Sequence, residues 1–164
     1  MTVDNNMNAE TNNGDRVRRS TSAEVNQNID RAIATNIQQY ANQPEANITQ
    51  KIAELDREWD TERILEANAS VLAFTGLMLG IFVNHNWFWL TGIVLPFLFQ
   101  HAVQGWCPPI FVIRRLGVRT RSEIDKEKFA LKVLRGDFAN LPKASEADAG
   151  TRANAALKVV GVQN

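Results

Sequence analysis

The longest stretch without fixed charge decides what this chain can fold into. It runs from Ala67 to Ile113 and holds no Asp, Glu, Lys or Arg over 47 residues, although 22% of the chain is charged. Two membrane-spanning helices need about 20 apolar residues each, so the stretch is long enough for both. A buried helical hairpin of a soluble protein is the alternative, because core helices can be equally apolar.

The charge-free stretch divides into two helical segments. Residues 67–84 would span about 27 Å as a helix, close to the thickness of the hydrocarbon core of a bilayer. The sequence NHN at residues 84–86 then turns the chain. In the second segment, residues 87–106, Pro96 is expected to kink the helix rather than end it. Tryptophans lie at the segment ends, where an aromatic belt would sit, and they favour the membrane hairpin. They are Trp87, Trp89 and Trp106.

The basic residues predict how the hairpin is oriented. The turn between the two segments has no Lys or Arg, and basic residues flank the outer ends instead. They are Lys51, Arg57, Arg63, Arg114, Arg115, Arg119 and Arg121. Because Lys and Arg near span ends stay in the cytosol, both termini are predicted to be cytoplasmic. The first residues have no basic segment followed by an apolar core, so no secretory signal is predicted.

The sequence before the hairpin predicts a disordered tail, followed by cytosolic amphipathic helices over residues 21–66. Residues 1–20 are rich in Asn, Thr and Asp and predict a disordered tail. A helix over 21–41 follows, with the spacing of a capping box at Thr21 and Glu24. Its apolar positions are Val25, Ile29, Ile33, Ile37 and Tyr40. This narrow stripe fits either a membrane surface or a partner helix, and the near-neutral polar face favours the partner helix.

A second cytosolic helix is predicted to begin near Pro44, which suits a first helical position. One face carries Ile48, Ile52, Leu55 and Trp59, and charged residues cover the rest. No Gly or Pro interrupts the chain near Glu66, so one helix can continue into the first span.

After the hairpin, residues 107–138 are predicted to form a membrane-exit turn and one more cytosolic helix. Thr120 and Glu123 repeat the capping-box spacing, and Gly136 stands where helices often stop. Residues 139–164 predict a flexible tail. The expected fold class is therefore an all-α membrane protein, a two-span transmembrane helical hairpin with amphipathic cytosolic helices on both sides and disordered tails.

Small residues form a seam along the first span. Ala69, Ala73, Gly76 and Gly80 recur at helical spacing and include the pattern GxxxG. Such a seam lets another helix approach closely. Either the second span of the same chain or another copy can fill this role, so a homo-oligomer through the seam is one of the expectations.

Three polar residues stand at the cytosolic end of the second span. Gln100, His101 and Gln104 are expected to share a face, near Asn68 and Ser70 of the first span. Hydrogen bonds between the helices are the simpler interpretation. A proton-handling or thiol-handling role for His101 is the alternative.

The only cysteine, Cys107, lies at the predicted membrane exit. Pro108 and Pro109 follow at once and are expected to stop the helix where water can reach the freed carbonyls. Cys107 is either a small buried hydrophobic residue or a thiol that the nearby Arg114 and Arg115 make reactive. A lone cysteine excludes an internal disulfide, and one histidine with one cysteine offers too few ligands for a metal.

No enzyme signature accompanies these features. The sequence has no glycine-rich phosphate loop, no metal cluster and no second nucleophile with a base to form a triad. The protein is therefore predicted not to be an enzyme and to need no cofactor. Equal numbers of acidic and basic residues, 18 of each, argue against nucleic acid as a partner.

Two stretches resemble the YgaP-like transmembrane-domain family, a bacterial inner-membrane family whose name marks a domain of unknown function. They are ELDREWDTERILEANAS and GWCPPIFVIRRLGVRTRSEIDKEKFALKVLRGDF, within residues 54–138. The resemblance implies the same two-span hairpin in a bacterial inner membrane. In some relatives the hairpin follows a rhodanese domain, a sulfurtransferase that carries sulfur on a cysteine. Within the second stretch, Cys107 and Pro108 are the positions that match the Cys-Pro pair of the family.

Two functions are expected from these observations. The first is a non-enzymatic membrane anchor or oligomeric accessory protein, with the lipid bilayer and a cytosolic protein as partners. The second is sulfur or small-anion handling at the membrane, with Cys107 as the thiol carrier and His101 as its proton partner.

Overall fold

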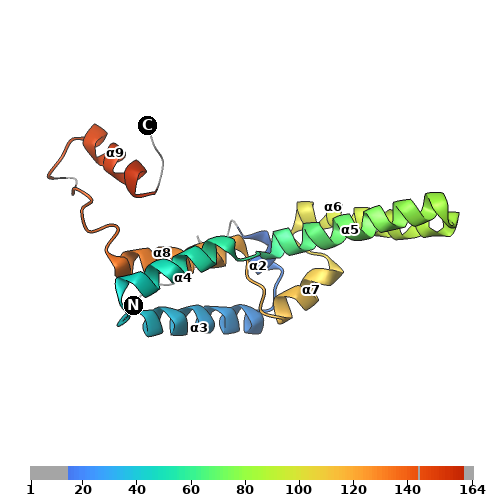
Figure 1. Ribbon diagram of the computed structural model, residues 1–164, viewed down its shortest axis with the longest axis horizontal. Coiled ribbons are helices and arrows are strands. Elements are labelled where there is room, and N and C mark those ends of the chain that lie inside the picture. The colour runs from blue at the N-terminus through green and yellow to red at the C-terminus, as the bar shows by residue number, and fades with distance from the viewer. Residues whose placement is uncertain (1–14, 144, 161–164) are drawn as a thin grey trace. The chain divides into compact units, whose positions relative to one another are not determined.

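The computed structural model describes residues 15–143 and 145–160, and these residues are helical wherever they form regular structure (Figure 1). The elements are α2 (Arg16–Arg19), α3 (Ala23–Tyr40), α4 (Glu45–Arg57), α5 (Thr61–Phe82), η1 (His85–Trp87), α6 (Phe88–Gln104), α7 (Pro108–Arg115), α8 (Arg121–Arg135) and α9 (Ala149–Val159). Over the described residues the chain divides into two compact units. The first comprises residues 15–34 and 58–124, and the second comprises 35–57, 125–143 and 145–160.

The charge-free stretch forms a helical hairpin in the first unit. The Asp60 side chain caps α5 by accepting a hydrogen bond from the Arg63 N–H at 2.8 Å. Asn84 shapes the turn in the same way by accepting from the Asn86 N–H at 2.8 Å. α6 then runs beside α5 (Figure 1) and continues through Pro96, so the proline does not end the helix.

Small residues of α5 lie directly against α6 of the same chain. Ala69, Gly76 and Gly80 are buried. A Cβ atom at Gly76 would lie 2.6 Å from Thr91 Oγ1, and one at Gly80 would lie 2.6 Å from the Phe88 ring. The Thr91 hydroxyl donates to the Ala73 carbonyl at 2.9 Å. The seam is therefore occupied within the chain, and a second copy that used it would have to displace α6.

A small apolar core closes the other end of the hairpin. Val17 of α2, Leu65 of α5, Cys107 and Ile110 of α7 are its buried members. Residues 15–20 were expected to belong to a disordered tail, but residues 16–19 form α2, whose Val17 is 98% buried in this core. Residues 1–14 lie outside the described part of the chain.

The exit from α6 differs from the sequence-based expectation. The helix ends at Gln104, and Gly105 follows in the left-handed conformation with φ +73°. A side chain at Gly105 would also collide with the backbone of Arg16. Both the left-handed conformation and the lack of space therefore require glycine at this position. The prediction that Pro108 and Pro109 stop the helix is wrong. They begin α7, where the first turn needs no N–H donor.

The starts of α3 and α8 follow from side-chain caps. The Thr120–Glu123 capping box is confirmed, since each backbone N–H donates to the side chain of the other residue. The box predicted at Thr21 is not formed: α3 begins at Ala23, and Ser22 Oγ accepts from the Val25 N–H at 3.4 Å. The Thr21 hydroxyl donates to the Val17 carbonyl instead, which frees its lone pairs for another donor.

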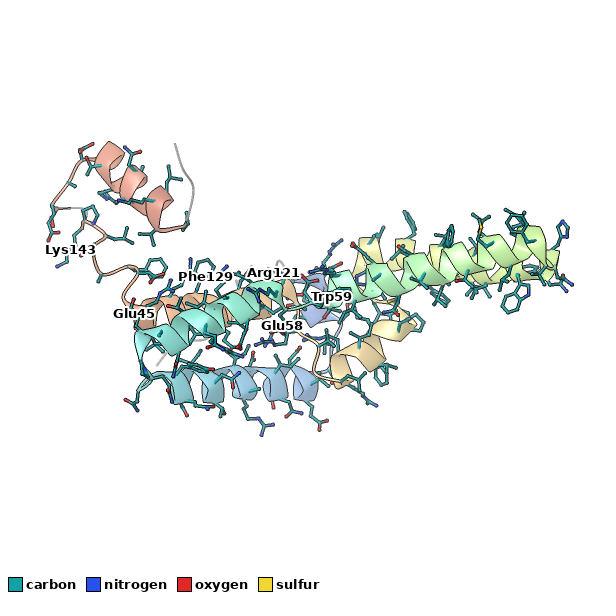
Figure 2. All side chains as sticks on the ribbon, viewed as in Figure 1. Glu45, Glu58, Trp59, Arg121, Phe129 and Lys143 are labelled. Carbon is teal, nitrogen blue, oxygen red and sulfur yellow. The ribbon has the colours of Figure 1, made fainter. Side chains whose placement is uncertain are left out.

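The second unit is built from the end of α3, α4, most of α8 and α9. Ile48, Ile52 and Leu55 of α4 are buried as predicted, whereas Trp59 is 49% exposed. Trp59 lies in the break at residues 58–60, which interrupts the single helix that was expected to continue into the span (Figure 2).

Polar contacts connect the helices of this unit. Asn36 of α3 donates to Glu127 of α8 at 3.1 Å, and Arg135 of α8 donates to Thr49 of α4 at 3.0 Å. Lys128 forms an ion pair with Asp56.

The C-terminal segment is not wholly irregular. Residues 149–159 form α9, which Asp148 caps by accepting from the N–H groups of Gly150 and Thr151. None of its residues is buried, so the sequence lacks the periodic pattern of apolar residues that would have predicted this helix. Residues 144 and 161–164 of the predicted tail lie outside the described residues.

The close packing at Gly76 in the seam predicts how substitutions of glycine change the stability of the hairpin. Gly76→Ala should destabilise the hairpin by about 1–3 kcal/mol, because the added methyl group overlaps Thr91 and forces the helices apart. Gly92→Ala is the matched control on α6, since nothing lies within 4 Å of its Cβ position. Alanine should stabilise the helix there by up to about 1 kcal/mol. Thermal unfolding in detergent micelles measures both variants. Equal melting temperatures would show that the packing at Gly76 has no energetic importance.

Candidate functional site

A buried cluster of charged residues lies at the open end of the hairpin, within the first unit. Arg114 is at its centre, projecting from the last turn of α7 with only 2% of its surface exposed. Its Nη1 and Nη2 atoms bind the two carboxylate oxygens of Glu123, each at 2.7 Å. The remaining N–H groups donate to Thr21 Oγ1, Asn26 Oδ1 and the Val118 carbonyl at 3.0–3.1 Å. All five guanidinium donors are therefore satisfied.

Glu123 is fully buried, and its carboxylate accepts four hydrogen bonds. Besides the two from Arg114, Oε1 accepts from Arg18 Nη1 at 2.7 Å and Oε2 accepts from the Thr120 N–H at 2.8 Å. Burial by itself raises the pKa of this carboxyl, but the bonds from Arg114, Thr120 and Arg18 outweigh it and leave the pKa below its usual value. Glu123 is therefore ionised at neutral pH.

Arg18 completes the cluster from α2. It pairs with both Glu123 and Asp30 of α3. Burial acts to lower the pKa of its guanidinium, and the two carboxylates raise it to a net value above normal. Two arginines and two carboxylates thus balance in charge, and the pairing connects α2, α3, α7 and α8.

The sequence suggested other roles for these residues. Arg114 was interpreted as a topology marker, Glu123 as a helix cap and Arg18 as part of a disordered tail. A signal for Arg114 did exist: it lies one turn after Ile110 on a short helix, so it shares the buried face. Nothing in the sequence pointed to Arg18 as its neighbour, because 96 positions separate them.

His101 of α6 is buried and faces α5. It is 3% exposed, and its Nε2 lies 3.1 Å from Glu62 Oε2 of α5. Its Nδ1 is buried and has no hydrogen-bond partner in the described part of the chain. A histidine paired with a carboxylate across two helices fixes the distance between them at this level.

The predicted polar face of the second span is not formed. Gln100 and Gln104 hydrogen-bond to each other at 3.4 Å on an exposed side of α6, whereas His101 faces α5. The expected neighbour Asn68 donates to the Ile64 carbonyl of its own helix, and Ser70 is exposed. A step of one residue turns a helix by about 100°, which separates His101 from Gln100.

Cys107 lines an apolar groove between α5, α6 and α7, with about 1% of its surface exposed. Burial raises the pKa of its thiol and Glu62 raises it further, although the Ile110 N–H acts to lower it; the net pKa is above the usual value. The nearby cations do not help, because Arg114 is fully paired and Arg115 stacks on the Phe111 ring at 3.9 Å. Cys107 is therefore a neutral thiol that packs as a small hydrophobic residue.

The other predicted site residue at the exit from α6 is Pro108. Pro108 is the first residue of α7 and has no polar side chain to offer. Among the described residues, no three His, Cys, Asp or Glu side chains are grouped so as to hold a metal ion. The site connects helices and presents no activated nucleophile.

Comparison with known proteins finds no match, since no family model, no curated protein and no solved structure corresponds to this chain. The resemblance to the YgaP-like transmembrane-domain family stays a prediction.

The charged cluster generates a prediction about local stability. Arg114→Met should loosen α2 and the first turn of α8 by about 3–5 kcal/mol, because it leaves a buried carboxylate short of partners. Hydrogen exchange of the amides at 16–19 and 120–124 should then accelerate on the order of a hundredfold or more. Arg115→Met is the control. It removes the neighbouring arginine, whose side chain is exposed, so the hydrogen exchange of these amides should change little. Unchanged protection in both variants would contradict a structural role for the cluster.

Proposed function

We propose that this chain is an integral membrane protein whose α5–α6 hairpin spans a bilayer, and that it works as a non-enzymatic anchor with cytosolic docking helices. One observation carries the membrane step: large apolar side chains project outward along both helices (Figure 2). Phe74 is 63% exposed, Phe82 79%, Trp89 74% and Phe99 72%. A helical hairpin buried in a soluble core would hide such side chains, because a monomer rarely exposes so large an apolar surface.

Length and composition support the same conclusion. Among the described residues, the run Glu45–Phe82, which comprises α4 and α5, contains one stretch long and apolar enough to cross a membrane, and only 22% of that stretch is buried. α6 has 17 residues, or about 26 Å of helix, and carries no charge. Because α6 packs along α5 behind a tight turn, a bilayer that contains α5 must also contain α6.

The orientation with both termini in the cytosol follows from the basic residues. Arg114 and Arg119 are paired with carboxylates, but the rule counts Lys and Arg near span ends and gives Asp and Glu little weight. The turn at residues 84–86 carries none. Assignment to a bacterial inner membrane rests on the family resemblance.

The docking role is supported by an apolar stripe on α8. Phe129 is 47% exposed and Val133 61%, one helical turn apart (Figure 2 labels Phe129). Exposed residues at this spacing suit a partner helix or groove. The sulfur-carrier alternative gains nothing from the geometry, since Cys107 is a buried thiol of raised pKa and His101 pairs with Glu62.

Reporter fusions test the membrane step. A reporter at Asn164 should be active on the cytosolic side, and one inserted at Asn86 should be active on the opposite side. Replacing Arg114, Arg115, Arg119 and Arg121 together, with lysines added at residues 84–86, should invert or scramble the hairpin. A fusion at Asn164 that reports from outside in the unmodified protein would falsify the model.

Photocrosslinking tests the docking role. A photoreactive amino acid at Val133 should crosslink in intact membranes to one protein, either a cytosolic partner or a second copy, whereas the same group at the exposed polar Gln39 should not. Val133→Glu should abolish co-purification of that protein because it places a charge in the apolar contact. A protein that stays monomeric and uncrosslinked at Val133 in its native membrane would count against an anchor or accessory function.

A further inference from the structure

The groove beside Cys107 is a candidate binding site that the proposed anchor function does not use. It lies between α7 and the two helices of the hairpin, and its volume is about 420 Å³. Leu72 of α5, Leu98 of α6, and Val112 and Ile113 of α7 line it together with Cys107. The amide of Asn68, which also lines it, already donates to a carbonyl of its own helix. The groove therefore offers apolar contacts and almost no free hydrogen-bonding groups.

α7 exposes large apolar side chains although one of its charged residues is buried. Its inward face carries the charged Arg114, which is satisfied by Glu123. Phe111 and Val112 of α7 and Leu116 just after it are 54%, 56% and 78% exposed. The exposed Arg115 stacks on Phe111. A short helix that exposes apolar side chains beside an arginine is suited to a lipid interface.

We propose that the groove binds an acyl chain of a membrane phospholipid and that α7 lies in the cytosolic membrane interface; this inference rests on the proposed membrane hairpin. The groove opens onto the surface that the hairpin turns toward lipid, because Leu72 and Phe97 line it and are 46% and 40% exposed. Leu72 and Phe97 therefore belong to both surfaces, so an acyl chain can pass from one to the other.

A lipid suits the groove better than water does. A site lined by apolar side chains gives water too few polar partners, and such spaces stay dry or take apolar ligands. The neutral thiol of Cys107 is consistent with that surrounding. Arg115 supplies the polar counterpart: it is exposed and stacks on Phe111, and no acid pairs with it among the described residues. An arginine of this kind extends its guanidinium toward lipid phosphates while its stem stays in the apolar layer.

Photolabelling with a phospholipid that carries a diazirine on its acyl chain tests the proposal. The full-length protein is reconstituted in phosphatidylcholine and phosphatidylglycerol vesicles, and labelled residues are identified by mass spectrometry. Leu98 and Ile113 are only partly exposed, yet they should be labelled at least as strongly as Val103, which is 59% exposed on the outer side of α6. Val133 of α8, with 61% exposure, is the cytosolic control and should stay unlabelled.

Matched substitutions separate the groove from the general lipid surface. Val112→Trp should fill the groove and lower the labelling of Leu98 and Ile113 several-fold, whereas Val103→Trp should leave it unchanged. If Phe74 is labelled but Leu98 and Ile113 are labelled less than Val103, protein covers the groove, a second copy included, and the proposal is overturned while the hairpin stands. If Phe74 is not labelled either, the membrane hairpin itself fails.

Discussion

The rest of the structure depends on one buried carboxylate, that of Glu123, held between Arg114 and Arg18 at 2.7 Å. The three residues come from α8, α7 and α2, and the Arg114 guanidinium also reaches Thr21 and Asn26 on the α3 side. Buried ion pairs add little net stability, because desolvation offsets their attraction, but a broken pair leaves an uncompensated charge. The cluster therefore acts mainly by excluding other arrangements of these helices.

The position of the cluster in the sequence has a physical reason. Arg114 is the first charged residue after the charge-free stretch, so it stands at the boundary between apolar and aqueous surroundings. An unpaired arginine there would draw α7 away into water. Paired with Glu123, it lets α7 keep Ile110 and Cys107 in the apolar core beside Leu65. In the proposed membrane orientation, Arg114 would count as a basic residue near a span end, and its pairing with Glu123 would neutralise it in the folded protein.

Sequence reasoning succeeded where a single local rule governs. The absence of charge predicted the hairpin helices, and the Thr120–Glu123 spacing predicted the start of α8 at its observed residue. It failed where distant residues decide: α2 is ordered by Val17 and Arg18, whose partners lie about a hundred positions away. The prediction that Gln100, His101 and Gln104 share one polar face of α6 was wrong for a simpler reason. The burial of His101 against α5 depends on how the helix is rotated about its axis.

The exit from α6 shows why the prolines misled. A proline pair predicts an interruption, yet the interruption comes earlier, at Gly105, where a left-handed residue reverses the chain and Arg16 donates to the Ala102 carbonyl that the helix end leaves free. The prolines then start α7 at once, because their fixed φ suits a first turn. Only Gly105, Trp106 and Cys107 separate the two helices, so α7 folds back against α5 and α6. A longer linker would release α7, and the groove would lose one of its three walls.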